Sequence, residues 1–358
     1  MINLKNIGKF HELPEMAMHI YNGNVPALLL AIEGGWDIEE DIILSQHISL
    51  SPLDLSLRLQ RLNVIRLLVE HGVNLNVKNN SAFLLAVRYC KEDVVRYIVQ
   101  HGAKLDMLNQ VGSGAYSQAY YGNKNNIPLI HELGLNIRQY GGPVLRQAVS
   151  NHDMKTVTYL LDQGVDINYN KPDMVYPYQA TPLTVATRMQ NLTMVKYLVE
   201  RGANVTLAEK DGERPYTIAV GLKNTILADY LKALEPAMLH DLENKKYEVK
   251  KYKLSDELIS FLTGEELRLE LDTNDYDIRY IDFFTLTDTF EMKVGRQKLL
   301  RLSAYVDNYS DLQIVWNPRK KQIGCYDVEH QEYADLCSFK EFVVNPETFV
   351  INFLEGEL

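Results

Sequence analysis

The sequence predicts an α-solenoid of about six to seven helical repeats, followed by a small α+β domain. A phrase of apolar residues ending in glycine recurs along the first two-thirds of the 358-residue chain. The recurrence stops near residue 235, and β-branched and aromatic runs replace it from residue 254 onward. We therefore expect a solenoid at 1–235, a charged linker at 236–253 and an α+β domain at 254–358.

Each copy of the recurring phrase is an apolar helix, a glycine, a small or apolar residue, and then Asn or Asp. VIRLLVEHGVNL (64–75) and MVKYLVERGANV (194–205) are two of the copies. The helix-ending glycines stand at 35, 72, 102, 134, 164 and 202, which gives spacings of 37, 30, 32, 30 and 38 residues. Glycine suits this place because it adopts a left-handed backbone at little cost. The apolar stripe of each helix needs a neighbouring repeat to cover it.

The starts of the first helices carry a second signature. Ser51-Pro52-Leu53 and Thr181-Pro182-Leu183 put a hydroxyl at the N-cap and proline at the first helical position. Together with Gly202-Ala203-Asn204-Val205, these residues resemble the ankyrin repeat family, whose period is roughly 33 residues. The resemblance extends over about residues 12–235. It implies a stack of helix pairs that recognises proteins and does not catalyse reactions.

The region after residue 254 mixes helix and strand signals. Ser255 stands at the N-cap position of a predicted helix at 254–262. Strands are predicted at 279–286, 312–317 and 321–328, and helical turns at 338–354.

The end of this region resembles the SUKH superfamily. Ser338-Phe339 and Phe342 follow the last predicted strands, as they do in that superfamily, and the helix at 254–262 resembles its opening helix. The resemblance implies an immunity-type binding domain, which in bacteria neutralises a toxin inside the producing cell.

Charge and hydropathy exclude several classes of function. The net charge of −10 is uneven, because residues 1–235 hold 22 basic and 23 acidic residues while residues 236–358 hold 15 and 24. Nucleic acid is a poor expected ligand, since binding it requires clustered Lys and Arg. A basic protein partner fits better. No apolar run is long enough to cross a membrane, and the first residues do not form a signal peptide, so a cytoplasmic location is expected.

Catalytic and metal constellations are not predicted. Cys90, Cys325 and Cys337 are too scattered for a disulfide framework or a zinc site. The run Asp272–Asp277 has Asp277 where a calcium loop needs glycine. We expect no enzyme activity, no cofactor and no metal.

Tyrosines at loops and repeat turns are the first candidate binding residues. Tyr169, Tyr176 and Tyr178 lie in the long loop 168–179, and Tyr89, Tyr121 and Tyr140 lie at or near repeat turns. Tyrosine is enriched among residues that dominate binding energy, and stiff loops lose little entropy on binding. The alternative is that the rings of the loop simply cover the adjacent stack.

An acidic stretch at 255–291 gives the second set of candidates. It holds 11 Asp or Glu residues against Arg268 and Arg279, and Asp272, Asp275 and Asp277 are its densest part. Such a surface would attract a basic toxin domain, although a charge run is ordinarily just solvated surface.

These features favour a non-catalytic protein that binds and neutralises a cognate toxin or effector. The alternative is a scaffold or adaptor that joins two protein partners, one to each domain. The oligomeric state is left open by the sequence.

Overall fold

The computed structural model describes residues 1–4 and 7–357 and divides into two compact units. The repeat unit comprises residues 1–148, 155–166 and 173–175, and the C-terminal unit comprises residues 149–154, 167–172 and 176–358. Within the described ranges, no helix combines the length and the apolar character needed to cross a membrane.

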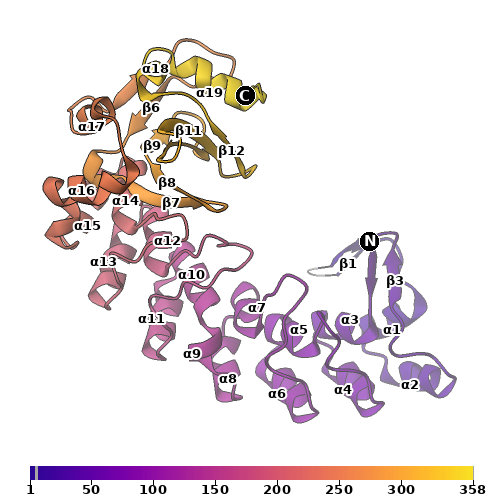
Figure 1. Cartoon of the computed structure of the whole chain (residues 1–358). Coiled ribbons are helices and arrows are strands. Elements are labelled where there is room, and N and C mark those ends of the chain that lie inside the picture. The colour runs from indigo at the N-terminus through magenta and orange to yellow at the C-terminus, as the bar shows by residue number, and fades with distance from the viewer. Residues whose placement is uncertain (5–6, 358) are drawn as a thin grey trace. The chain divides into compact units, whose positions relative to one another are not determined.

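The repeat unit is a series of short antiparallel helix pairs (Figure 1). The first helices of successive pairs, α3, α5 and α7, pack against one another in order. The helices are α1 (Glu15–Asn22), α2 (Val25–Glu33), α3 (Pro52–Arg58), α4 (Leu62–Glu70), α5 (Ala82–Tyr89), α6 (Glu92–Gln100), α7 (Ala115–Tyr121), α8 (Asn126–Glu132), α9 (Ile137–Tyr140), α10 (Gly142–Ser150) and α11 (Met154–Asp162), with α10 and α11 lying at the division between the units.

Local capping agrees with the sequence signatures. The Ser51 hydroxyl accepts a hydrogen bond from the Asp54 backbone N–H at 3.1 Å, which fixes the start of α3. Gly72, just after α4, has a φ of 85°, a left-handed conformation that a residue with a side chain rarely adopts. The helices therefore begin and end where the recurring phrase places their boundaries.

Two β-hairpins in the first 50 residues were not predicted. Both are antiparallel, and their strands are too short to give a clear alternating pattern of apolar residues. They are β1 (Ile2–Leu4) with β2 (Gly8–Phe10), and β3 (Ile42–Ser45) with β4 (Ile48–Leu50).

The C-terminal unit begins with two further helix pairs and continues into a region rich in strands. The helices are α12 (Pro182–Arg188), α13 (Leu192–Glu200), α14 (Pro215–Gly221), α15 (Thr225–Lys232), α16 (Leu242–Val249), α17 (Asp256–Leu262), α18 (Phe339–Phe342) and α19 (Pro346–Glu355), with 3₁₀ turns η1 (Ala237–His240), η2 (Lys250–Tyr252) and η3 (Leu286–Asp288).

Two antiparallel sheets form the strand-rich region. One has the strand order β12-β11-β10-β8-β7, and the other has the order β5-β6-β9. The strands predicted at 279–286, 312–317 and 321–328 correspond to β6, β10 and β11. The strands are β5 (Arg268–Glu270), β6 (Tyr280–Phe283), β7 (Phe290–Val294), β8 (Gln297–Arg301), β9 (Ser303–Val306), β10 (Leu312–Asn317), β11 (Gln322–Asp327) and β12 (Glu332–Asp335).

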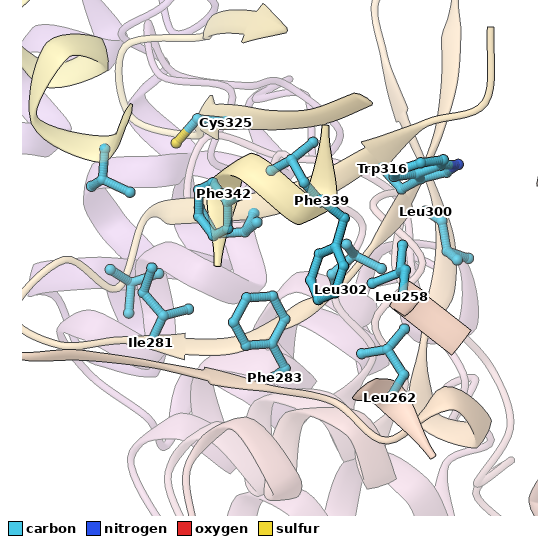
Figure 2. Packing of buried hydrophobic residues seen from close by; sticks show 14 of the residues in the cluster. Leu258, Leu262, Ile281, Phe283, Leu300, Leu302, Trp316, Cys325, Phe339 and Phe342 are labelled. Atoms are coloured by element: carbon cyan, nitrogen blue, oxygen red, sulfur yellow. The ribbon is translucent and has the colours of Figure 1, made fainter. Parts of the chain in front are cut away.

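A single apolar cluster joins the sheets to α17, α18 and α19 (Figure 2). Trp316 on β10 is 1% exposed, and its indole N–H donates to the Tyr252 carbonyl at 2.8 Å. Tyr252 belongs to the segment 236–253, predicted as a charged linker, in which η1, α16 and η2 form. Val249 and Tyr252 from this segment are buried in the same cluster, so the end of the segment is part of the core.

The second pair of helices, α14 and α15, also packs on the strands within this unit. Gly212, in the turn before α14, lies so close to β7 that a Cβ atom there would stand 2.3 Å from the Glu291 carbonyl oxygen. Lys223 pairs with Asp282 of β6 at 2.6 Å. Glycine at 212 is therefore required by the close approach of the two backbones as well as by its φ of 93°.

Candidate functional site

The loop 168–179 holds three of the predicted tyrosines, and all three rings are half-buried. Tyr176 and Tyr178 contact each other edge to face with 6.1 Å between centroids, and the Arg188 guanidinium stacks on Tyr178 at 5.3 Å. Burial raises the pKa of the Tyr178 hydroxyl. The large apolar side chains that this loop exposes are those of Met174 and Val175, at 74% and 59%. Sequence reasoning missed these two residues.

Two other predicted tyrosines, Tyr89 and Tyr121, line one cavity of about 730 Å³ in the repeat unit. It lies where α5 and α7 end, and we call it the α5–α7 cavity. Tyr121 is 56% exposed and is the most accessible aromatic ring of its lining. Tyr140, at the end of α9, is half-buried and does not line this cavity. The lining also includes Gln60, Arg88, Lys91, Asn123 and Asn125.

Two guanidinium groups flank Tyr89, and one of them, Arg88, also lines the cavity. The Arg58 and Arg88 side chains lie 5.1 and 5.4 Å from the ring centroid, within cation–π range. Arg58 also donates to the Tyr89 hydroxyl at 3.2 Å, and Arg88 donates to the Gln118 side-chain oxygen at 3.0 Å. The ring and both cations therefore have fixed positions.

Side-chain amides order the turn between α7 and α8 beside the cavity. Asn126 is 2% exposed and donates to the Val87 and Cys90 carbonyl oxygens at 2.8 and 3.0 Å. Asn123 also donates to the Cys90 carbonyl at 3.0 Å. These bonds satisfy the open carbonyls at the end of α5 and tie the α7–α8 turn to it, so the cavity is preformed.

The predicted aspartates of the acidic stretch lie in one exposed loop between β5 and β6. Asp272, Asp275 and Asp277 are exposed, and among the described residues none of them forms an ion pair. Asn274 orders the loop, because its side chain accepts from the backbone N–H of Tyr276 at 3.1 Å and donates to the Ile278 carbonyl at 2.7 Å. The loop thus presents three uncompensated carboxylates.

The arginines near this loop already form ion pairs with other aspartates. Arg279 pairs with Asp307 at 2.7 Å, and Arg268 pairs with Asp282 at 2.7 Å. The Arg279 guanidinium holds the pKa of the Asp307 carboxyl below its usual range. The local excess of negative charge therefore stays with the loop aspartates.

Three carboxylates precede α14, those of the buried Glu209 and Glu213 and of the half-buried Asp211, and one oxygen from each lies within 4.8 Å of the others. Arg188 pairs with Glu209 and with Glu213, the latter at 2.8 Å, and Arg301 of β8 pairs with Glu213 at 2.6 Å. Because these guanidinium groups already bind the carboxylates, the cluster suits a structural ion-pair network better than a metal site.

The pKa values of this cluster reflect one carboxylate in excess over the two guanidinium groups. Burial raises the pKa of Glu209 to about 7 and also raises that of Asp211. Burial opposes ionisation of Glu213 too, but Arg301 and Arg188 together hold its pKa below the usual range. Glu213 is the ionised partner shared by α12 and β8.

The three cysteines are buried and free. Burial raises the pKa of the Cys90 and Cys337 thiols to about 12 and that of Cys325 well above its ordinary value. A thiol with so high a pKa is a poor nucleophile at neutral pH. These residues are parts of the packed interior.

Comparison with known proteins identifies the repeats. A family model described as ankyrin repeats, in three copies, matches residues 16–109, 117–209 and 145–236, which is more than half of the chain. The chain belongs to the ankyrin repeat family. This membership confirms the predicted repeats. Ankyrin repeat domains bind protein partners, and proteins of the family are generally non-catalytic.

Two relatives illustrate the similarity. An ankyrin repeat protein of Fowlpox virus (strain NVSL), FPV022, is 28% identical over 191 residues, a match that covers 52% of this chain and 29% of the viral protein. The chain thus spans less than a third of the length of that relative. The crystal structure of the human ASB11 ankyrin repeat domain is 19% identical with a TM-score of 0.48, and the match covers 62% of this chain and 98% of that domain.

The structure thus brings together only part of the predicted set. Tyr89 and Tyr121 share a cavity, and Asp272, Asp275 and Asp277 share a loop. Sequence reasoning missed the cations beside the tyrosines, which are Arg58, Arg88 and Lys91.

Proposed function

We propose that this chain is a non-catalytic, immunity-type protein that binds one protein partner, a toxin or effector, and neutralises it by occupying its surface. The observation that carries the proposal is the preformed α5–α7 cavity of the repeat unit, with Tyr89 and the exposed Tyr121 in its lining. A preformed cavity with fixed aromatic rings loses little entropy on binding, so contacts made there contribute most of their energy to affinity.

Each predicted domain has its own role in this proposal. The solenoid at 1–235 provides the aromatic contacts, and the SUKH-like domain at 254–358 adds an acidic surface. Residues 236–253 connect the two, and the end of this segment, with Val249 and Tyr252, is part of the core of the second. Asp272, Asp275 and Asp277 are exposed and unpaired within the described residues, which supports a role in attracting a basic toxin domain. Tyr140, Tyr169, Tyr176 and Tyr178 do not line this cavity, so we assign them a lesser share of the binding.

An adaptor that joins two partners is the second candidate. The division of the chain into two compact units favours it, because each unit could hold a separate partner. A neutralising protein forms one complex in which an activity is lost, whereas an adaptor holds two partners that stay active.

The test is affinity capture from cells of the source organism with three forms of the full chain, followed by assay of the captured proteins. The forms are the unchanged chain, Tyr89→Ala/Tyr121→Ala, and Asp272→Asn/Asp275→Asn/Asp277→Asn. We expect one partner, inactive when bound, that the tyrosine variant loses and that the aspartate variant captures more slowly at low salt. Two partners, each active and each lost from a different variant, would replace this proposal with the adaptor.

A further inference from the structure

Three arginines occupy the same position in different repeats. Arg58, Arg88 and Arg188 each stand seven residues after the N-cap of their helix, which is Ser51, Ser81 or Thr181. Each lies near the end of the first helix of its pair. Arg88 and Arg188 can be compared closely, because the turn that follows each of them has the same backbone.

The turns Asn109–Ser113 and Glu209–Glu213 share their backbone hydrogen bonds. The first residue of each donates to the carbonyl of the last, at 3.1 Å in the Asn109 turn and at 2.7 Å in the Glu209 turn. The glycine of each, Gly112 or Gly212, donates back to the first residue, at 2.9 and 3.0 Å. Both glycines have positive φ, 72° and 93°. The turns therefore differ in side chains and not in backbone course.

The side chains of the two turns determine whether carboxylates lie beside each arginine. Arg188 pairs with Glu209 and Glu213, and Glu213 is the ionised carboxylate. Asn109 and Ser113 stand at the corresponding positions of the other turn, and Arg88 bonds only the neutral Gln118. Across residues 1–4 and 7–357, Arg88 has no carboxylate within ion-pair distance.

The cations around Arg88 also form no ion pairs. Lys91 is exposed, lines the same cavity and has no ion pair with any residue in the described ranges. Arg58 donates to the Tyr89 hydroxyl and likewise forms no ion pair there, and its charge is balanced in part by the nearby Asp54 carboxylate of its own helix. The lining of the α5–α7 cavity contains no Asp or Glu. A chain of net charge −10 thus carries a preformed site with a local positive charge.

We propose that the α5–α7 cavity binds an acidic, extended peptide segment of a protein partner. Arg88 and Lys91 bind its carboxylates, and the exposed Tyr121 ring packs against the peptide stem. The side-chain amides of Gln60 and Asn125 line the same space and suit hydrogen bonding to a peptide backbone. This inference rests on the proposed protein-binding function and adds the chemistry of the bound segment.

A peptide fits these observations better than nucleic acid does. Nucleic-acid affinity comes from a long row of cations that displaces counterions along the phosphates. Basic and acidic residues are nearly equal in number over residues 1–235, at 22 and 23, so this region has no excess of positive charge to form such a row. A short acidic segment needs only a local cluster with planar, forked donors such as Arg88.

The experiment selects a displayed library of random 12-residue peptides on the full chain. We expect the recovered peptides to be enriched several-fold in Asp and Glu relative to the library. Synthetic copies should lose at least tenfold in affinity for Arg88→Gln/Lys91→Gln and also weaken with added salt. Lys155→Gln, which changes an exposed lysine of α11 outside the cavity, is the matched control and should bind as the unchanged chain does.

Two further variants distinguish a loss of binding caused by charge from one caused by misfolding. Lys91→Glu reverses the charge of an exposed side chain and should abolish binding without removing any buried contact. Asn109→Glu/Ser113→Glu copies the Glu209 turn onto the Arg88 repeat and should abolish acidic-peptide binding with Arg88 still present. Thermal melting of each variant checks that its fold is retained.

Other outcomes separate this inference from the function on which it rests. Recovery of neutral or basic peptides, or equal binding of acidic peptides by all variants, overturns the acidic-segment inference and leaves protein binding intact. Recovery of no peptide, with a partner still captured by the full chain, also overturns it. Binding of a 20-nucleotide single strand that is lost with Arg88→Gln/Lys91→Gln would assign the cavity to nucleic acid instead.

Discussion

The turn Asn109–Ser113 after α6 and the turn Glu209–Glu213 after α13 have the same backbone course but different roles. In the Glu209 turn, carboxylates bind Arg188 of the repeat and Arg301 of β8, so the turn ties the last repeats to the sheet within the C-terminal unit. In the Asn109 turn, neutral side chains leave Arg88 free of carboxylates at a cavity. In a repeat protein, the side chains of a turn thus decide whether a shared backbone course is used for internal cohesion or for binding.

The largest expected effect comes from removing the carboxylate shared by two guanidinium groups. Glu213→Gln leaves Arg188 and Arg301 with one fewer negative partner in a buried site. We expect the free energy of unfolding of the C-terminal unit to fall by about 3 to 5 kcal/mol, since an unpaired buried charge is costly. Urea unfolding followed by Trp316 fluorescence, in a Trp36→Phe background, measures this unit alone because the chain has two tryptophans.

The control for this prediction is the corresponding position of the other turn. Ser113 contacts no guanidinium, and its hydroxyl only accepts from Gln118 at 2.9 Å. Ser113 lies in the repeat unit, so Ser113→Ala is followed through Trp36 in a Trp316→Phe background and should cost under about 1 kcal/mol. If Glu213→Gln lowers the free energy of unfolding as little as Ser113→Ala does, the ion-pair network does not stabilise the C-terminal unit.

Glu209, in the same turn, makes the stability of the C-terminal unit depend on pH. The folded chain raises the pKa of Glu209 to about 7 from an ordinary value of 4.5, so between these values the folded state keeps a proton that the unfolded state releases. The free energy of unfolding must then decrease as the pH rises through this window. We expect Glu209→Gln to remove about 2 kcal/mol of that decrease between pH 5 and 7.

Urea unfolding at several pH values, with the Trp316 signal, measures this slope. Glu243→Gln is the control, because Glu243 is an exposed partner of Lys246 on α16 within the same unit and should leave the slope unchanged. If Glu209→Gln has the same slope as the unchanged chain, Glu209 is ionised in the folded state throughout the window.

Much of this fold could be predicted from the sequence, and much of the site could not. The glycine phrase and the Ser/Thr-Pro signature located the repeat helices because they are local signals. The hairpin of β7 (FEMKV) and β8 (QKLLR) was missed because these strands contain only one β-branched residue, Val294. Its place in the sheet depends on pairing with β10, which lies further along the chain.

The cavity shows why site residues are harder to predict than repeats. Tyr89 and Tyr121 were candidates as aromatic residues near turns, but their shared cavity depends on Asn126 reaching the carbonyls of Val87 and Cys90. One signal was available in the sequence. Aligning the repeats on their N-caps places Arg58, Arg88 and Arg188 together and pairs Asn109 and Ser113 with Glu209 and Glu213.

The smallest expected effect concerns the N-caps of the two repeats. Thr181 accepts from the Thr184 backbone N–H at 3.1 Å and forms a capping box at α12, whereas Ser81 makes no capping hydrogen bond at α5. Thr181→Ala should therefore lower the free energy of unfolding by about 1 kcal/mol, and Ser81→Ala should change it by less than about half of that. Urea unfolding measures the first through Trp316 and the second through Trp36 in a Trp316→Phe background. Equal costs for both substitutions would mean that Ser81 does cap α5 in solution, and the two repeats would then differ in the charges of their turns but not in how their helices begin.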